Sequence, residues 1–167
     1  MAVTTLDGRL PAGVRLPNGT ILMIRELHAT DEPALRAWFA TLSPSTRYHR
    51  FHGLVAELSA PDWRYLTRID QRDHVAILAL RDGGAIAGVA RMIRLSGEHD
   101  IAEVTFLVDD DLQQRRVGTV LRDVLIAIAR RRGYRRLYAY VLPDNVAIRR
   151  LLGKTSIDRG GLLEIAI

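Results

Sequence analysis

The chain has 167 residues, 48% of them apolar, and a formal net charge of +5 that comes almost wholly from arginine. This length suits one compact domain with its own core, and the apolar content excludes a disordered protein. No apolar run approaches the about 18 residues of a membrane-spanning helix, and the absence of cysteine excludes disulfides, thiolate metal sites and a cysteine nucleophile.

The start of the chain lacks the basic and apolar blocks of a signal peptide, so we expect a cytoplasmic protein. The arginines are not interleaved with aromatic side chains as they are in nucleic-acid-binding motifs. We therefore expect neither a nucleic-acid nor a membrane partner. The sequence does not fix the oligomeric state, and a homodimer is one assembly that it allows.

The first part of the chain contains a tail, one strand and three helices. Residues 1–19 predict a tail or a hairpin that turns at Pro17-Asn18-Gly19, and residues 20–167 predict a single domain. A strand is expected at 21–25. Helices are then predicted from start signals: the first with Thr30 as N-cap, the second from Ser43 to about Phe51, and the third from Ser59 to about Thr67, with Ser59 and Asp62 at capping-box spacing.

The second part alternates strands and helices. Strands are predicted at 74–80, 85–95, 101–108, 137–141 and 162–167, and helices at 118–132 and 146–152. The first three of these strands are joined by short turns and so pair antiparallel. The unit 101–141 is a strand–helix–strand crossover, which makes its two strands parallel. The pattern predicts an α+β fold: a largely antiparallel twisted sheet with one parallel crossover and helices on both faces.

The crossover points to a ligand. Its helix begins near Gly118, at the carboxyl end of the strand 101–108. Helical spacing predicts one apolar stripe that faces the sheet: Val117, Leu121, Val124, Leu125 and Ile128. Unpaired N–H groups and the positive dipole end at this place favour an anionic group, most simply a pyrophosphate. His49 and His52 share one side of the short second helix, but no third ligand is apparent, so we predict no metal site.

A family resemblance gives these features a common meaning. The segment 108–121 reads VDDDLQQRRVGTVL. It resembles the acetyl-CoA-binding motif of the GNAT acyltransferases, Q-x-x-G-x-G, with Gln113 in the first position and Gly118 in the last. Three segments most resemble bacterial protein lysine acetyltransferases: LSPSTRYHRF at 42–51, AEVTFLV at 102–108 and VLPDN at 141–145.

The resemblance implies a GNAT fold and an N-acetyltransferase that uses acetyl-CoA as co-substrate. In this fold the two parallel strands part where a bulge breaks their pairing, and pantetheine enters the gap like an extra strand. The residues implied to bind the cofactor are Leu107, Val108, Gln113, Gln114, Arg115, Arg116, Val117, Gly118, Thr119 and Asn145.

Arg116 departs from the family pattern, because it replaces the first motif glycine. Glycine there allows a positive φ or a close approach of backbone to phosphate. We expect Arg116 to be helical instead, so that it costs little and adds a guanidinium to the phosphate site. The alternative is a positive φ, which would strain the residue and weaken binding.

The resemblance also implies a mechanism. Glu103 matches the glutamate that these lysine acetyltransferases use as general base, and strand alternation places it on one face with Thr105 and Leu107. The amide of Val108 would stabilise the oxyanion. Many GNAT enzymes have a tyrosine acid where this chain has Leu152, so we expect no tyrosine acid.

Three functions remain open from the sequence. The first is acetyl transfer to a protein lysine by direct attack in a ternary complex. The second keeps this chemistry and changes the acceptor to a small amine. The third is a non-catalytic acyl-CoA-binding or partner-binding module, which Arg116 and the missing tyrosine would favour.

Overall fold

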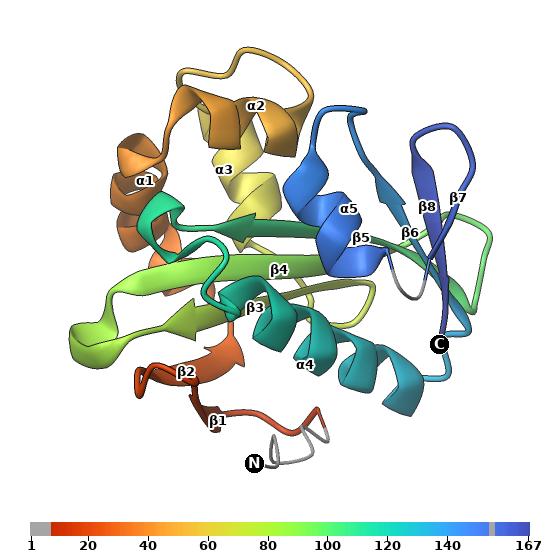
Figure 1. The fold of residues 1–167 in the computed structure, drawn as a ribbon, viewed down its shortest axis with the longest axis horizontal. Coiled ribbons are helices and arrows are strands. Elements are labelled where there is room, and N and C mark those ends of the chain that lie inside the picture. Colours follow the sequence, from red (N-terminus) through yellow and green to blue (C-terminus); the bar gives the residue numbers. More distant parts are fainter. Residues whose placement is uncertain (1–7, 154–155) are drawn as a thin grey trace.

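The computed structural model describes residues 8–153 and 156–167. In this part of the chain, eight strands form one mixed sheet in the order β1-β2-β3-β4-β5-β6-β8-β7 (Figure 1). The strands are β1 (Ala12–Arg15), β2 (Ile21–Glu26), β3 (His74–Leu80), β4 (Ile86–Arg94), β5 (Ile101–Val108), β6 (Arg136–Tyr140), β7 (Ser156–Asp158) and β8 (Leu162–Ala166). The helices are α1 (Glu32–Thr41), α2 (Pro44–Phe51), α3 (Ala60–Thr67), α4 (Val117–Arg131) and α5 (Val146–Leu152). No helix of the described segments is long and apolar enough to cross a membrane.

The sheet is antiparallel except between β5 and β6, which α4 connects. The predicted α+β fold with one parallel crossover is therefore confirmed. The short strand β7, which pairs with β8, was not predicted from the sequence. β1 and β2 form a hairpin in which the N–H of Gly19 donates to the carbonyl of Leu16 at 2.9 Å.

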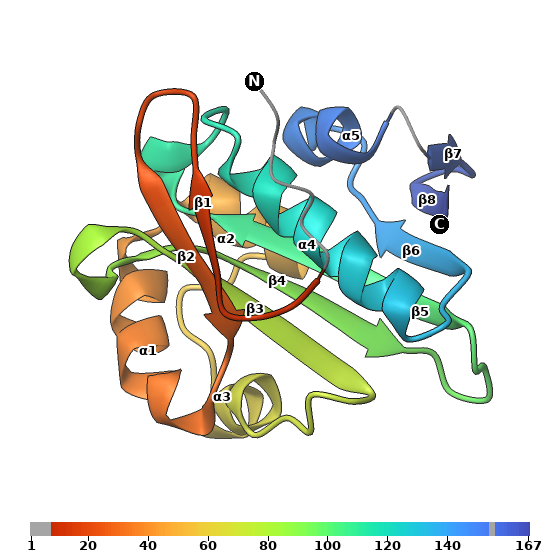
Figure 2. The ribbon, with the colours of Figure 1, turned by 90° about the horizontal axis from the view of Figure 1, so that it is seen from below.

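Helices cover both faces of the sheet (Figure 2). α4 lies on one face, and α1 and α3 lie on the other. The apolar stripe predicted for α4 is buried in the larger core: Val117, Leu121, Val124, Leu125 and Ile128. A second core under α1 and α3 contains Trp38, Phe39 and Trp63 together with Leu107 of β5. Because β3 is covered on both faces, its residues 75–79 are all buried, and it reads as one continuous apolar run.

Two of the three predicted helix starts are confirmed. Ser43 accepts a hydrogen bond from the N–H of Thr46, and Ser59 forms the predicted capping box with Asp62. The prediction for Thr30 is wrong, because α1 begins at Glu32 after a 3-10 turn. The carboxylate of Asp31 organises this start: it accepts from the His28 N–H at 2.8 Å and pairs with the Arg25 guanidinium at 2.7 Å.

β5 and β6 separate soon after they meet. Their pairing covers three residue pairs, from Ile101↔Arg136 to Glu103↔Tyr138. Beyond this point β6 remains paired with β8 up to Tyr140 and leaves the edge of β5 without a neighbour. The bulge predicted at this separation is wrong, since the described pairing of β5 with β4 continues in register from Ala102 to Val108. β6 thus stays paired with β8 after its pairing with β5 has ended.

Candidate functional site

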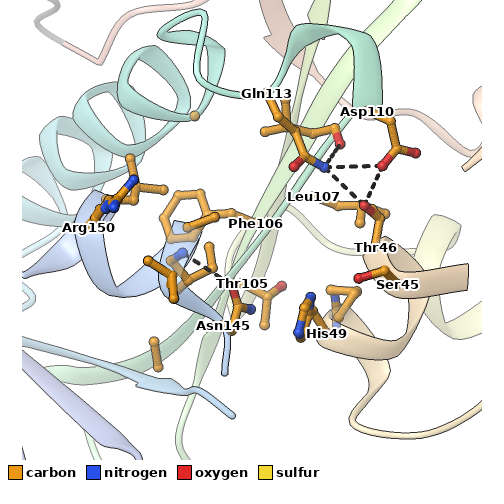
Figure 3. A pocket seen from close by; sticks show the side chains of 18 of the residues that line it. Ser45, Thr46, His49, Thr105, Phe106, Leu107, Asp110, Gln113, Asn145 and Arg150 are labelled. Carbon is orange, nitrogen blue, oxygen red and sulfur yellow. Dashed lines mark hydrogen bonds between the residues drawn. The ribbon is translucent and has the colours of Figure 1, made fainter. Parts of the chain in front are cut away.

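A cleft of about 920 Å³ lies where β5 and β6 separate (Figure 3). Six consecutive residues of β5, 103–108, line one wall, and Ala139 and Tyr140 of β6 also line the cleft. Side chains alternate between the faces of a strand, so six consecutive lining residues mean that the cleft follows the edge of β5.

The backbone groups along this edge can be assigned from the pairing. The N–H of Asp109 donates to Ala87 at 3.0 Å, and the carbonyl of Ile101 accepts from Leu95 at 3.1 Å, so the odd-numbered residues of β5 bond to β4 and its extension. Backbone groups alternate sides along a strand, so those of Val104, Phe106 and Val108 point the other way, into the cleft. An extended ligand with amide groups can satisfy them, because unpaired backbone groups need partners.

The N-terminus of α4 forms one end of the cleft, which Gln114, Arg116, Gly118 and Thr119 line. No side chain caps this 15-residue helix. The first helical hydrogen bond runs from the N–H of Val120 to the carbonyl of Arg116, at 3.0 Å. The preceding amides are thus available to an anion, and the helix dipole favours negative charge there.

Arg116 has φ 70° and ψ 2°, the left-handed conformation. The expected helical conformation is therefore wrong. Gln114 also has a positive φ, 59°. The turn before α4 keeps the backbone shape that the motif glycine would supply, although Arg116 occupies the position. The side chain of Arg116 is exposed and lines the cleft.

The side chain of Gln113 is held by neighbouring protein groups (Figure 3). Its amide nitrogen donates to the Thr46 hydroxyl at 2.9 Å and to the Asp110 carboxylate at 3.3 Å. Asp110 also accepts from the Thr46 hydroxyl at 2.6 Å and from the N–H and hydroxyl of Ser43 at 2.7 and 2.8 Å. These hydrogen bonds hold the pKa of Asp110 below its usual value against the opposing effect of burial. The loop before α4 is thereby fastened to the start of α2.

The other predicted cofactor residues are distributed around the cleft. Leu107 and Val108 line it from β5. Asn145 lines it and caps α5, where its side-chain oxygen accepts from the Ile148 N–H at 3.2 Å. Arg115 and Val117 belong to the same turn but their side chains do not line the cleft: Arg115 is exposed, and Val117 is fully buried in the core.

Glu103 is half-buried on the cleft wall at the end where β5 still pairs with β6. Val104 and Phe106 belong to the core under α4, whereas Leu107 belongs to the core under α1 and α3. Glu103 and Thr105 therefore point to the α1–α3 side, as the alternation predicted. The Thr105 hydroxyl is buried without a hydrogen-bond partner among the described residues.

Several lining residues were not predicted as functional. α2 contributes Arg50, β6 contributes Tyr140, and α5 contributes Arg150. The His49 Nε2 atom lies 3.3 Å from a carboxylate oxygen of Asp144, which joins α2 to the turn after β6. Sequence reasoning missed Arg50, Tyr140 and Arg150 because the helices and the strand that carry them meet at the cleft only through tertiary packing.

Comparison with known proteins places the chain among acetyltransferases. Residues 28–155 match the model of the acetyltransferase (GNAT) family. The chain is 34% identical over 146 residues to acetyltransferase Pat of Mycolicibacterium smegmatis, covering 86% of this chain and 43% of that protein. It is 32% identical over 139 residues to acetyltransferase PA5475 of Pseudomonas aeruginosa, covering 81% of this chain and 74% of that protein. The chain thus spans less than half the length of the first of these relatives.

Solved structures show the same fold. The GNAT domain of S. lividans PAT superimposes with a TM-score of 0.84 at 29% identity, covering 93% of this chain and 95% of that one. A cAMP-binding acyltransferase from Mycobacterium smegmatis gives a TM-score of 0.67 at 27% identity, covering 94% of this chain and 47% of that one.

Proposed function

The chain belongs to the GNAT family of acetyltransferases, and from this premise we propose that it transfers an acetyl group from acetyl-CoA to the side-chain amine of a protein lysine, with Glu103 as the general base. The observation that carries the proposal is the unpaired edge of β5 in a cleft that ends at the uncapped N-terminus of α4.

The cleft has groups suited to each part of acetyl-CoA. The inward-facing backbone groups of Val104, Phe106 and Val108 can pair with the two amides of pantetheine, as an added strand would. The amides of Gln114 and of residues 116–119 can receive the diphosphate, whereas that of Arg115 donates to the carbonyl of Leu112 at 3.3 Å. The guanidinium of Arg116 can pair with phosphate oxygens. When bound, acetyl-CoA supplies the activated acetyl thioester.

Glu103 is positioned to deprotonate the acceptor. A free lysine ammonium has a pKa of about 10.4, so a base must remove a proton before the amine can attack. Glu103 lines the cleft on the α1–α3 side, from which an acceptor can approach the edge of β5. The thioester is at the end of pantetheine away from the diphosphate, so the inward-facing N–H of Phe106, which is nearer to Glu103 than that of Val108, is the proposed donor to the developing oxyanion.

The position of the tyrosine acid found in many GNAT enzymes is occupied by Leu152, which is fully buried in the core. It cannot donate a proton. We propose that the leaving thiolate takes its proton from solvent or from the acceptor, unless Tyr140, which lines the cleft from β6, supplies it.

Lysine as the acceptor is supported by the segments 42–51, 102–108 and 141–145, which resemble bacterial protein lysine acetyltransferases. In the structure these segments form α2, β5 and the turn after β6, and all three line the cleft. A protein lysine is therefore the first acceptor to test.

Release of free CoA from acetyl-CoA in the presence of lysine-containing proteins and peptides tests the proposal. Replacing Glu103 by Gln should lower turnover at least tenfold, because a general base contributes on the order of 10²–10⁴ in rate. The matched control is Glu98→Gln, because Glu98 is exposed in the turn before β5. Retained turnover in the Glu103→Gln variant would remove Glu103 from the role of base, and absence of acetyl-CoA binding would defeat the whole proposal.

A further inference from the structure

Two arginines on the acceptor side of the cleft have no carboxylate partner in the described structure. Arg50 of α2 lines the cleft together with Glu103, and it also lines a small recess of about 30 Å³ behind it. Arg91 of β4 lines the same recess and is 4% exposed. No ion pair within 4 Å involves either arginine among the described residues.

Arg91 is held by neutral groups. Its Nη1 atom donates to the carbonyl of Leu66 at 2.7 Å and lies 3.2 Å from the Nε2 atom of His74. Burial, followed by the charge of Arg91, lowers the pKa of His74 to about 4, so this imidazole is neutral near pH 7 and brings no compensating charge. Burial and the nearby charge of Arg50 lower the pKa of Arg91 to about 9.

The positive charge of Arg50 is also poorly compensated by neighbouring groups. Its guanidinium lies 4.8 Å from the centre of the Phe51 ring. Burial lowers the pKa of Arg50, and the charges of Glu103 and Tyr65 act in the opposite direction with smaller effect. Glu103 is therefore the carboxylate that faces Arg50, at a distance beyond a direct ion pair. Of the other two acids that line this cleft, Asp144 lies beside His49, and Asp110 accepts hydrogen bonds from Ser43 and Thr46.

Arg91 is almost completely buried and Arg50 is half-buried, and a guanidinium removed from water without an anionic partner is energetically costly. The adjacent Thr105 adds an unpartnered buried hydroxyl, and it lies opposite Arg91 in the β4–β5 register. Together these side chains offer positive charge and a hydroxyl donor beside the proposed base. That is the complement of a carboxylate.

We infer that Arg50 forms a carboxylate subsite, so that the preferred acceptor carries a carboxylate close to its reacting amine. The inference rests on the proposed acetyl transfer in this cleft. A lysine beside an acidic residue and a free amino acid both meet this description. An acceptor with only positive charge does not, because two arginines would repel it.

The carboxylate is assigned to the acceptor because of where Arg50 lies. Arg50 is on α2, over the sheet face to which Glu103 and Thr105 point. The acyl carrier is proposed to follow the edge of β5 through the groups of Val104, Phe106 and Val108. A carboxylate on the acyl group, as in succinyl-CoA, would pair with Arg50 by the same chemistry but would belong to the acyl donor. The experiment distinguishes a carboxylate of the acceptor from one of the acyl donor.

The test uses matched ligands. Two lysine peptides differ only in Glu or Gln beside the lysine, and glycine is compared with glycinamide. Their binding to the CoA-saturated protein is measured by calorimetry, and their acetylation by CoA release. Acetyl-CoA and succinyl-CoA are compared in the same way. The variants are Arg50→Gln and, as control, Arg64→Gln, because Arg64 is exposed on α3.

The wild-type protein should bind the carboxylate member of a pair more tightly. Arg50→Gln should reduce this preference roughly 10- to 100-fold through KM, with kcat little changed, and Arg64→Gln should retain it. An Arg50→Lys variant, which keeps the charge, should retain part of the preference. Equal binding of both members by the wild type, or a preference that survives Arg50→Gln, overturns the inference. A preference for succinyl-CoA alone overturns its assignment to the acceptor.

The binding measurement keeps the two proposals separable. A carboxylate preference in binding without any CoA release would defeat the proposed function and leave the subsite standing. Acetylation without a carboxylate preference would support the proposed function and defeat the carboxylate subsite.

Discussion

Arg116 combines a costly backbone conformation with a useful side chain. A non-glycine residue in the left-handed region is destabilised by roughly 1–2 kcal/mol. Arg116 lies there with φ 70°, directly before α4, and its guanidinium lines the cleft. Arg116 thus lowers the stability of the fold through its backbone conformation, and its side chain adds a cation at the proposed diphosphate site.

Two substitutions separate these effects. Arg116→Gly should raise the free energy of unfolding by about 1 kcal/mol, because glycine adopts a positive φ without strain, whereas Arg116→Ala should bring no such gain. Both variants should bind CoA more weakly, because both lose the guanidinium. Urea denaturation and calorimetry with CoA measure the two quantities. Equal stability of the two variants would contradict an effect of φ.

His74 makes stability depend on pH. Its pKa is lowered to about 4 in the folded protein, first by burial and then by Arg91, while an unfolded histidine has a pKa of about 6.5. As the pH falls below about 6.5, the unfolded chain therefore takes up a proton before the folded protein does. The contribution of neutral His74 is fully present above pH 6.5 and is lost as the pH falls toward 4.

Solvent screening of this half-buried group reduces the effect, so we expect the loss to be on the order of 1–2 kcal/mol. Urea denaturation at pH 7.5 and pH 5 should show a clearly smaller pH effect in His74→Gln than in the wild type. His99→Gln is the control, because His99 is exposed in the turn between β4 and β5. An unchanged pH effect in His74→Gln would show that other groups cause it.

Among the elements, α2 and the loop before α4 are coupled through Asp110. The carboxylate accepts hydrogen bonds from Ser43 and Thr46 at the start of α2 and from Gln113 in the loop. A ligand that orders the loop should therefore also order α2, which brings His49 and Arg50 to the cleft.

Hydrogen exchange can measure this coupling. Acetyl-CoA should slow amide exchange in residues 44–51 of the wild type, and Asp110→Asn should lose most of this slowing. Asp111→Asn is a matched control, because Asp111 is adjacent and exposed. Equal slowing in all three proteins would contradict a coupling through Asp110.

The predictability of each element follows from the range of the interactions that form it. The capping box of Ser59 and Asp62 and the apolar stripe of α4 depend on residues a few positions apart, and both were predicted. The hydrogen bond from Gln113 to Thr46 joins residues 67 positions apart, and no local pattern indicates it. The family resemblance predicted the cleft and the motif turn that precedes α4. It could not give the conformation of Arg116, because the motif has glycine there.

For the whole molecule, the cleft predicts stabilisation by acetyl-CoA. The carbonyl of Val108 already accepts a hydrogen bond from the Gln113 side chain at 3.4 Å, and a bound extended ligand can satisfy the other edge groups of β5, so binding should favour the folded state. At a ligand concentration of about 100 times Kd the gain is about 2.7 kcal/mol, which corresponds to a rise of roughly 5–10 °C in Tm. A thermal melt measures it. A short acetyl thioester without pantetheine or diphosphate should give a smaller rise, and an unchanged Tm with acetyl-CoA would contradict the role of the cleft.

The three residue pairs that join β5 to β6 act as the closed end of a wedge. Ala102 and Leu137 form the middle pair and are almost completely buried, so the packing beneath them sets the angle at which the two halves of the sheet diverge. That angle fixes the width available to an acyl chain near Val108. Selectivity for acyl length can therefore change through apolar substitutions of Ala102 and Leu137, which do not line the cleft.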